Sequence, residues 1–170
     1  MIRNRKQRGS AIVEFALAGI VSCFLLICTT QLAMGMWRYH TLALAVHDAT
    51  RYVSVHGHGC TKIGYGCSIT VANIANKIKA VGIGLPDDSL NITLTTDSGA
   101  QTACAPLNSC YSTATVWPPS TNNDDRTGKK ITISAQYQFK SALLFFWPGQ
   151  GSQRFGAIWL PASSSQNILF

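Results

Sequence analysis

A single carboxylate stands inside the most apolar part of the chain. Between Ser10 and Trp37 the only charged side chain is Glu14. A carboxylate within a membrane span costs a few kcal/mol on insertion scales, and such residues are usually paired and functional. Glu14 is therefore the first residue for which we expect a chemical role, the formation of a charge pair in a low dielectric.

The histidines do not suggest a catalytic arrangement. All four lie on, or just after, one predicted helix: His40, His47, His56 and His58. Asp48 is next to His47, but adjacent helical residues face different directions. The chain has no G-x-S-x-G, no H-E-x-x-H and no phosphate-binding glycine loop. We therefore expect no enzymatic activity and no cofactor.

Six cysteines divide into two groups. Cys23 and Cys28 sit inside the apolar run and are expected to be free thiols. The other four are disulfide candidates: Cys60, Cys67, Cys104 and Cys110. Pairing of near neighbours, residue 60 with 67 and 104 with 110, is the economical choice among three connectivities. Such bonds persist in an oxidising compartment such as the bacterial periplasm.

The segment from His56 to Cys67 has a rival interpretation as a zinc site, because His56, His58 and Cys60 follow one another at two-residue spacing. That spacing is not a standard zinc-ligand pattern. An oxidising compartment also favours the disulfide. We therefore expect no metal.

Positive charge is concentrated at the start of the chain. The net charge is +7, and four of the fourteen basic residues precede Gly9: Arg3, Arg5, Lys6 and Arg8. The rest carries +3 and lacks the clustered cations that bind nucleic-acid phosphates, so nucleic-acid binding is not expected. Lys and Arg beside an apolar span stay cytoplasmic, which predicts a cytoplasmic N-terminus and an extracytoplasmic C-terminal region.

Residues 11–37 form an apolar run of 27 residues, more than the ~20 that a helix needs to cross a bilayer. A cleaved secretory signal has a shorter apolar core followed by a small-residue cleavage site, which this run lacks. Apolar residues continue at helical spacing as far as Val53, before Gly57 and Gly59. The sequence predicts one helix from Ser10 to about Val55, roughly 70 Å long, with only its first half in lipid.

The remaining residues predict a small α+β head. An amphipathic helix is expected over residues 69–81, and strands are expected over 90–96, 130–139 and 154–160. Residues 97–128 are rich in Ser, Thr, Asn, Gly and Pro, and we expect them to be too polar to form a core. A short antiparallel sheet of about three strands needs a cover for its apolar face. The second half of the long helix is the expected cover.

The residues around Gly9 resemble the processing site of type IV pilin-like proteins. They read R-G-S-A-I-V-E-F-A-L from Arg8 to Leu17. A basic leader followed by R-G-x-A-x-x-E-F-A is similar, more specifically, to the TadE/TadF pseudopilins of the Tad (Flp) tight-adherence pilus. Residues 45–53, AVHDATRYV, also resemble the A-x-x-A-A-R-x-A helix exit of TadE-like proteins. The head is similar to that family only in outline.

The resemblance implies a processing step. In that family a membrane-embedded prepilin peptidase cuts directly after the glycine, which places the cut between Gly9 and Ser10 and makes Glu14 the fifth mature residue. Glycine lets an extended segment enter a protease, and we expect it to break the helix that starts after it. The new amino group at Ser10 would lie one helical turn from Glu14. Pairing of Glu14 with the amine of a neighbouring subunit would set the register of a filament.

A plainer alternative is a signal anchor with an incidental glutamate. Glu14 would then only interact with the helix dipole, with Ser10 as an N-cap. A capping box would require the acid at Val13. The rival function is a single-pass inner-membrane protein whose periplasmic binding or adhesive domain never polymerises. A soluble secreted enzyme is a distant third.

The chain is thus expected to contain four segments: a basic leader over 1–9, a transmembrane helix over 10–37, its periplasmic continuation over 38–56, and a small α+β periplasmic domain over 57–170. The expected function is that of a minor pilin-like subunit in assembly of a Tad-type pilus or a related secretion filament. Its implied partners are the prepilin peptidase, other pilin or pseudopilin subunits, the assembly machinery and the membrane. It would reside in the bacterial inner membrane before any incorporation into an extracellular pilus.

Overall fold

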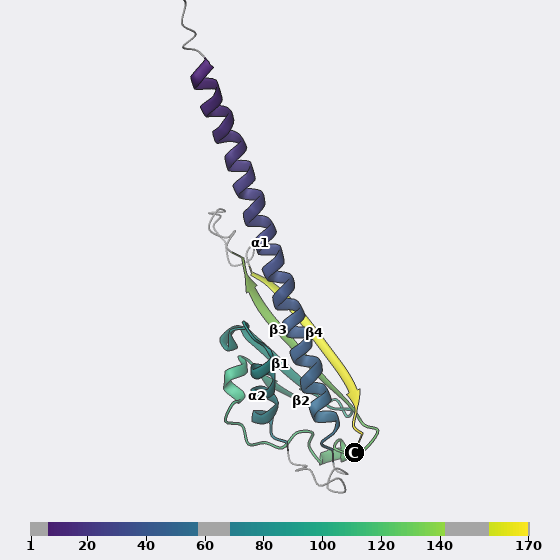
Figure 1. The fold of residues 1–170 in the computed structure, drawn as a ribbon. Helices are drawn as coiled ribbons and strands as arrows, with labels where there is room; N and C mark the ends of the chain where they lie inside the picture. The colour runs from purple at the N-terminus through teal and green to yellow at the C-terminus, as the bar shows by residue number, and fades with distance from the viewer. Residues whose placement is uncertain (1–6, 58–68, 142–156, 170) are drawn as a thin grey trace, which may run out of the picture.

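The structure of the protein is a computed structural model that describes residues 7–57, 69–141 and 157–169. Its longest element is α1 (Gln7–Ser54), a helix of 48 residues that projects from a small head (Figure 1). The helix begins before the expected Ser10 and passes through Gly9, where we predicted a break. One glycine costs a helix only about 1 kcal/mol relative to alanine. The good helix formers that follow offset that cost.

The head contains a four-stranded antiparallel sheet within the described residues, in the order β2–β1–β3–β4. The strands are β1 (Leu90–Thr95), β2 (Gln101–Cys104), β3 (Lys130–Lys140) and β4 (Ala157–Asn167). Buried residues alternate with more accessible ones along β1 and β3, so one face of the sheet points to the core. The predicted α+β class, a long helix carrying a small antiparallel sheet, is confirmed.

Two strand predictions were wrong. We expected about three strands, but β2 is a fourth, and β4 continues past Leu160 to Asn167. The end of β4 reads as a loop because Pro161 and three serines follow Leu160. However, β4 lies at the edge of the sheet, where a proline is tolerated. It pairs with β3 over its whole length, so ladder hydrogen bonds rather than apolar burial hold its polar half in place.

The prediction that residues 97–128 contribute no core was also wrong. Leu107 is fully buried and Trp117 is only 2% exposed. The same segment supports the start of α2 (Val71–Val81), because the first amide of that helix donates to the carbonyl of Thr115 at 2.9 Å. The first amides of a helix have no partner within it. A polar segment can therefore be structural through its backbone.

The apolar face of the sheet is covered by helix. The second half of α1 packs along β3 and β4, and α2 lies beside α1 (Figure 1). Five apolar residues of α1 are fully buried there: Leu42, Ala45, Val46, Ala49 and Val53. They follow the helical spacing expected from the sequence. The second half of α1 is thus the predicted cover.

Candidate anchoring and assembly site

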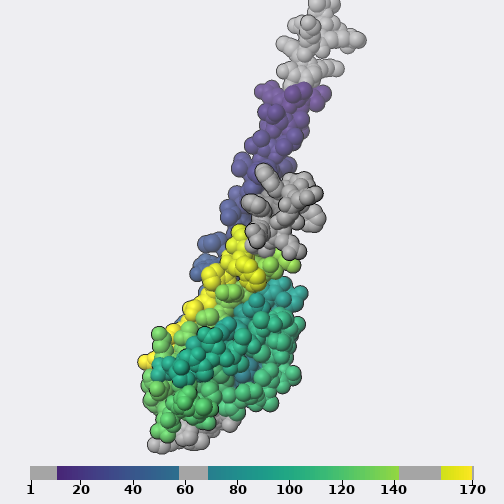
Figure 2. Space-filling model, turned by 180° about the vertical axis from the view of Figure 1, so that it is seen from behind, coloured from purple at the N-terminus to yellow at the C-terminus, as the bar shows by residue number. Residues whose placement is uncertain are grey.

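The first half of α1 projects beyond the head (Figure 2), and its last two turns, from Gln31 to Trp37, contact it. No residue from 11 to 37 is buried, and large apolar side chains are open to the surroundings, Phe15 at 81% and Ile20 at 72% exposed. In the described part of the chain, this helix is the one long and apolar enough to cross a membrane. Exposing this much apolar surface to water is unfavourable, so the segment requires lipid or other helices as its surroundings.

The hydroxyl groups in this half of α1 are satisfied by the helix itself. Ser22 donates its hydroxyl hydrogen to the carbonyl of Ala18 at 2.8 Å, and Thr30 donates to that of Leu26 at 3.0 Å. Lipid offers no hydrogen-bonding partner for a polar group. Back-bonding to the preceding turn therefore makes these residues compatible with a membrane span.

The predicted processing site lies in the first turns of α1. The backbone of Gly9 and Ser10 is helical, and Glu14 follows one turn later with an exposed side chain. Four residues of helix rise about 6 Å, which keeps Glu14 on the face of Ser10. Among the described residues, Glu14 makes no ion pair. Its carboxylate is therefore available for a partner outside this part of the chain. The side chains of Arg8 and Ser10, and the leader residues Arg3, Arg5 and Lys6, lie outside what the structure describes.

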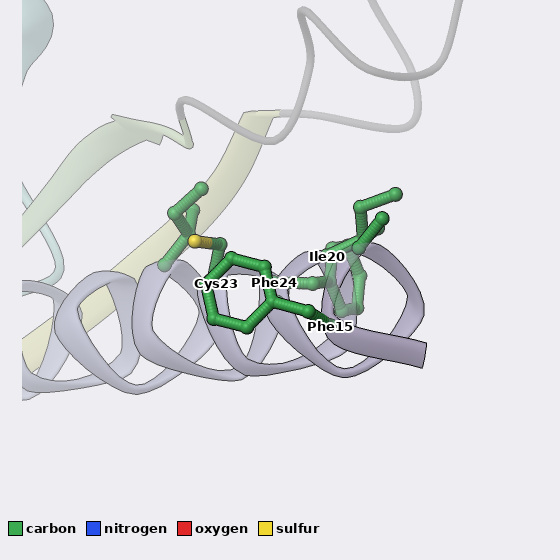
Figure 3. A pocket seen from close by; sticks show the side chains of 7 residues that line it. Phe15, Ile20, Cys23 and Phe24 are labelled. Carbon is green, nitrogen blue, oxygen red and sulfur yellow. The ribbon is translucent and has the colours of Figure 1, made fainter. Parts of the chain in front are cut away.

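A shallow apolar hollow runs along the surface of the same half of α1. Figure 3 shows side chains from this single helix around it, among them Phe15, Ile20, Cys23 and Phe24. Gly19 forms part of its floor, and no atom lies within 4 Å of the position that a Cβ would take there. A glycine between large side chains lets a neighbouring helix approach closely. The hollow is suited to an apolar side chain of such a helix, or to a lipid chain.

The second half of α1 is attached to the head at a defined point. Arg38, the first charged residue after the apolar run, donates from its guanidinium to the Tyr137 hydroxyl at 2.8 Å. The same guanidinium lies over the ring of Phe139, 5.3 Å from its centroid. Further along, Asp48 pairs with Lys77 of α2 at 3.0 Å, between largely accessible side chains. The position of Arg38 directly after the apolar run of residues 11–37 was the sequence signal available for it.

A buried carboxylate, that of Asp124, links two distant segments of the head by hydrogen bonds. Asp124 is 1% exposed and accepts hydrogen bonds from the backbone amide of Ser98, at 3.2 Å, and from its hydroxyl. Burial alone would raise the pKa of Asp124. The hydrogen bonds from Ser98 and Thr96, with Lys129 nearby, outweigh burial and hold this pKa below its ordinary value. No sequence signal identified Asp124, because its partners are far away along the chain.

The four cysteines within the described residues fall into the two groups that the sequence suggested. Cys104 and Cys110 form a disulfide with their Cα atoms 5.7 Å apart, which is the near-neighbour pair. Cys23 and Cys28 are free thiols on α1. Cys60 and Cys67 lie outside the described residues, so their expected pairing stays a prediction.

The histidines are dispersed. His40 and His47 are exposed on α1, while His56 lies just past its end with Nδ1 2.7 Å from the Tyr52 carbonyl. Within the ranges that the structure covers, His, Cys, Asp and Glu side chains do not gather into a group that could hold a metal ion. His58 lies outside those ranges. The zinc alternative at residues 56–67 lies almost entirely outside the described residues, so it is not tested by the structure.

Comparison with known proteins identifies the N-terminal segment. Residues 9–51 match the model of the family described as TadE-like protein. No curated protein and no solved structure matches the chain. The match begins at Gly9 and ends three residues before α1 does, so it covers both halves of this helix and none of the sheet.

The TadE-like resemblance expected from the sequence is thus confirmed over residues 9–51. The match indicates a pilin-like protein associated with the Tad pilus machinery and with a membrane. One N-terminal helix is available for the membrane contact.

Proposed function

We propose that this protein is a minor pilin-like subunit that prepilin peptidase cuts between Gly9 and Ser10. It then acts in assembly of a Tad-type pilus or a related secretion filament. The observation that carries the proposal is the TadE-like match over residues 9–51 on a helix whose first half has no buried residue in the described chain. The proposal assigns the protein no catalytic activity.

The physical basis is the exchange of one apolar environment for another. Residues 11–37 cannot remain exposed to water, but lipid and a bundle of similar helices satisfy them equally well. Membrane residence is then a storage state before assembly. The head, built on the second half of the same helix, keeps its own core throughout.

Pairing of Glu14 favours the filament over lipid and sets the axial register between neighbouring helices. A carboxylate in lipid costs about 2.5–3.5 kcal/mol on insertion scales unless it finds a partner. Cleavage after Gly9 creates such a partner, the α-amino group of Ser10. A neighbouring subunit that supplies the amine to Glu14 fixes the axial offset between two helices, which is the best-attested role of a buried charge pair.

Cleavage is tested by N-terminal sequencing of the mature protein from cells that contain active prepilin peptidase. The expected chain begins at Ser10. A Gly9→Leu variant should remain uncut, because a bulky side chain hinders entry of the scissile segment into the protease. An intact Met1 in the unmodified protein would rule out the processing step.

Assembly is tested with Glu14→Ala and a matched control, Asp88→Ala. Asp88 is an exposed carboxylate of the head whose only described hydrogen bond is from the hydroxyl of Ser89, at 3.4 Å. We expect Glu14→Ala to abolish filament assembly while membrane insertion persists, and Asp88→Ala to leave both unchanged. If Glu14→Ala assembles and functions normally, the rival function is favoured, a single-pass anchored periplasmic binding or adhesive protein that never polymerises.

A further inference from the structure

One end of the sheet reaches further along α1 than the rest of the head. The ring of Phe139 lies 3.8 Å from the position that a Cβ would take at Gly35, and the Ser141 hydroxyl lies 3.5 Å from Oε1 of Gln31. In Figure 1 the adjoining ends of β3 and β4 lie beside the helix above the other strands. The sheet therefore accompanies α1 into the last two turns of its apolar run.

The number of residues needed to cross a bilayer indicates how far from the hydrocarbon core this end of the sheet lies. About 20 helical residues cross the ~30 Å hydrocarbon core of a bilayer. Counted from Ala11 they end at Thr30, and counted from Phe15, after Glu14, they end at Met34. Gly35 then lies about 2–8 Å beyond the hydrocarbon, at 1.5 Å per residue. The polar headgroup layer is about 5–8 Å thick on each side, so Gly35 and the strand ends beside it fall within that layer.

The side chains at this depth are of the kind that a headgroup layer favours. Ile158, the cross-strand partner of Phe139, is 59% exposed, and the adjacent Trp159 is 49% exposed. On the helix, Trp37 is 53% exposed, and Lys140 is exposed at the end of β3. Trp is enriched where membranes meet water, and Lys can extend its charged end into the headgroups while its stem stays in apolar surroundings.

The rest of the sheet face that carries Trp159 has a different composition. Away from this end, the accessible positions of that face are mostly polar, and its hydroxyl side chains pair across β3 and β4. Ser134 lies 3.2 Å from Ser163, and Thr132 donates to Ser165 at 3.2 Å. A face that is otherwise largely polar has no need in water for an exposed Trp at one end, and Ile158 is exposed on the opposite face, beside Phe139. Their position coincides with the depth at which α1 leaves the hydrocarbon.

We propose that Trp37, Lys140, Ile158 and Trp159 form an interfacial rim that docks on the lipid headgroup layer of the membrane that α1 spans. This rests on the anchoring that the proposed function includes. The rim is continuous with the membrane-spanning segment, and it holds the head at a fixed height and orientation on the bilayer. Entry into a filament then requires release of the rim from lipid as well as withdrawal of the helix.

The test is photo-crosslinking of the full-length protein in nanodiscs of phosphatidylethanolamine and phosphatidylglycerol. Benzoylphenylalanine is placed singly at Phe24, Ile158, Trp159 or Ser165, and the adducts are identified by mass spectrometry. Phe24 is 54% exposed near the middle of the span and reports insertion. Ser165 is exposed on the same strand, about 20 Å further along β4 than Trp159.

We expect lipid adducts at positions 24, 158 and 159, decreasing in that order, and several-fold fewer at 165. Lipid adducts at 24 with none at 158 and 159 would overturn the rim while leaving the anchored helix intact. Adducts between two protein chains at 158 or 159 would also overturn it, since the occupant would then be a second copy. Absence of lipid adducts at all four positions would overturn the anchoring itself. The exposed aromatic at 159 makes the probe a conservative replacement, and the probe at 158 gives an independent reading.

Discussion

The two halves of α1 belong to one uninterrupted helix but differ in what surrounds them. Residues 11–37 are apolar around the whole circumference, and none of them is buried. Residues 38–54 carry a narrow apolar stripe, and five residues of that stripe are completely buried against α2 and the sheet. A helix that is apolar all round belongs in lipid or among other helices, whereas a striped helix belongs on the surface of a domain. The first half is therefore built for intermolecular contacts and the second half for the fold.

The difference has an energetic consequence. The second half is held by contacts made within the chain, so substitutions there change the stability of the head. The first half makes contacts with the head in its last two turns, and none of its residues is buried, so substitutions before Gln31 should change only insertion and assembly. Matched substitutions in the two halves test that separation.

The largest effect is expected from truncation of a leucine in each half. Leu42→Ala removes a fully buried side chain and should lower the free energy of unfolding of the head by about 3–4 kcal/mol, because it leaves a cavity. Leu25, which is 58% exposed, provides the matched control, and Leu25→Ala should leave that free energy unchanged. Urea denaturation in detergent micelles, followed by circular dichroism, measures both. Equal losses in the two variants would show that the halves are not energetically separate.

A charge introduced by substitution should affect membrane insertion when placed in the first half of α1 and not when placed in the second half. Phe24→Lys places an ammonium group in the middle of the span and should disfavour insertion by about 2.5–3 kcal/mol. His47→Lys adds a similar charge at an exposed position of the second half and should leave insertion unchanged. Carbonate extraction of membranes from cells that express each variant gives the inserted fraction. Full retention of the Phe24→Lys protein would contradict a lipid environment for the first half.

The cysteines of the head and those of the first half of α1 should also differ in their effect on stability, by a smaller amount than the leucines. Replacing both Cys104 and Cys110 by alanine removes the disulfide and should destabilise the head by about 2 kcal/mol, the chain-entropy value for so short a loop. Replacing both free cysteines of α1, Cys23 and Cys28, should not destabilise it. The midpoint of urea denaturation under non-reducing conditions compares the two double variants. If loss of the disulfide leaves the urea midpoint unchanged, packing alone holds the segment around Leu107 in place, and the disulfide does not stabilise the head.

The smallest effect is a dependence on pH confined to the head. The pKa of Asp124 lies below its ordinary value in the folded protein, so the unfolded chain takes up the proton first as the pH falls. The stabilisation is complete above the unfolded pKa, near pH 4, and is lost as the pH falls through the folded pKa. Asp124→Asn should cost about 1–2 kcal/mol at pH 7 and reduce the loss of stability on acidification. Urea midpoints at pH 7, 5 and 3 measure this. If Asp124→Asn loses as much stability on acidification as the unmodified protein, the dependence on pH comes from a group other than Asp124.

Local pattern was sufficient for much of this structure. The apolar run, the helical spacing of Leu42 to Val53, and the alternation along β1 and β3 each depend only on neighbours in the chain, and all three were predicted. The lone Glu14 after Gly9 and the TadE-like resemblance were also visible in the sequence, because a short motif of fixed spacing carries them. The end of β4 and the buried part of residues 97–128 were missed, because β4 is held by pairing with β3 and Leu107 by a core assembled from distant segments.

By itself, the sequence determined that α1 is one long helix with an apolar first half and a striped second half, since helix periodicity is a local property. How far the head reaches along that helix, in contrast, depends on tertiary contacts. The contact of Phe139 with Gly35, and of Arg38 with Tyr137, joins residues about a hundred positions apart. No local rule couples such residues. Their meeting depends on the register of β3 with β4 and on the packing of the sheet against α1, and that packing places the exposed Trp159 beside the end of the apolar run.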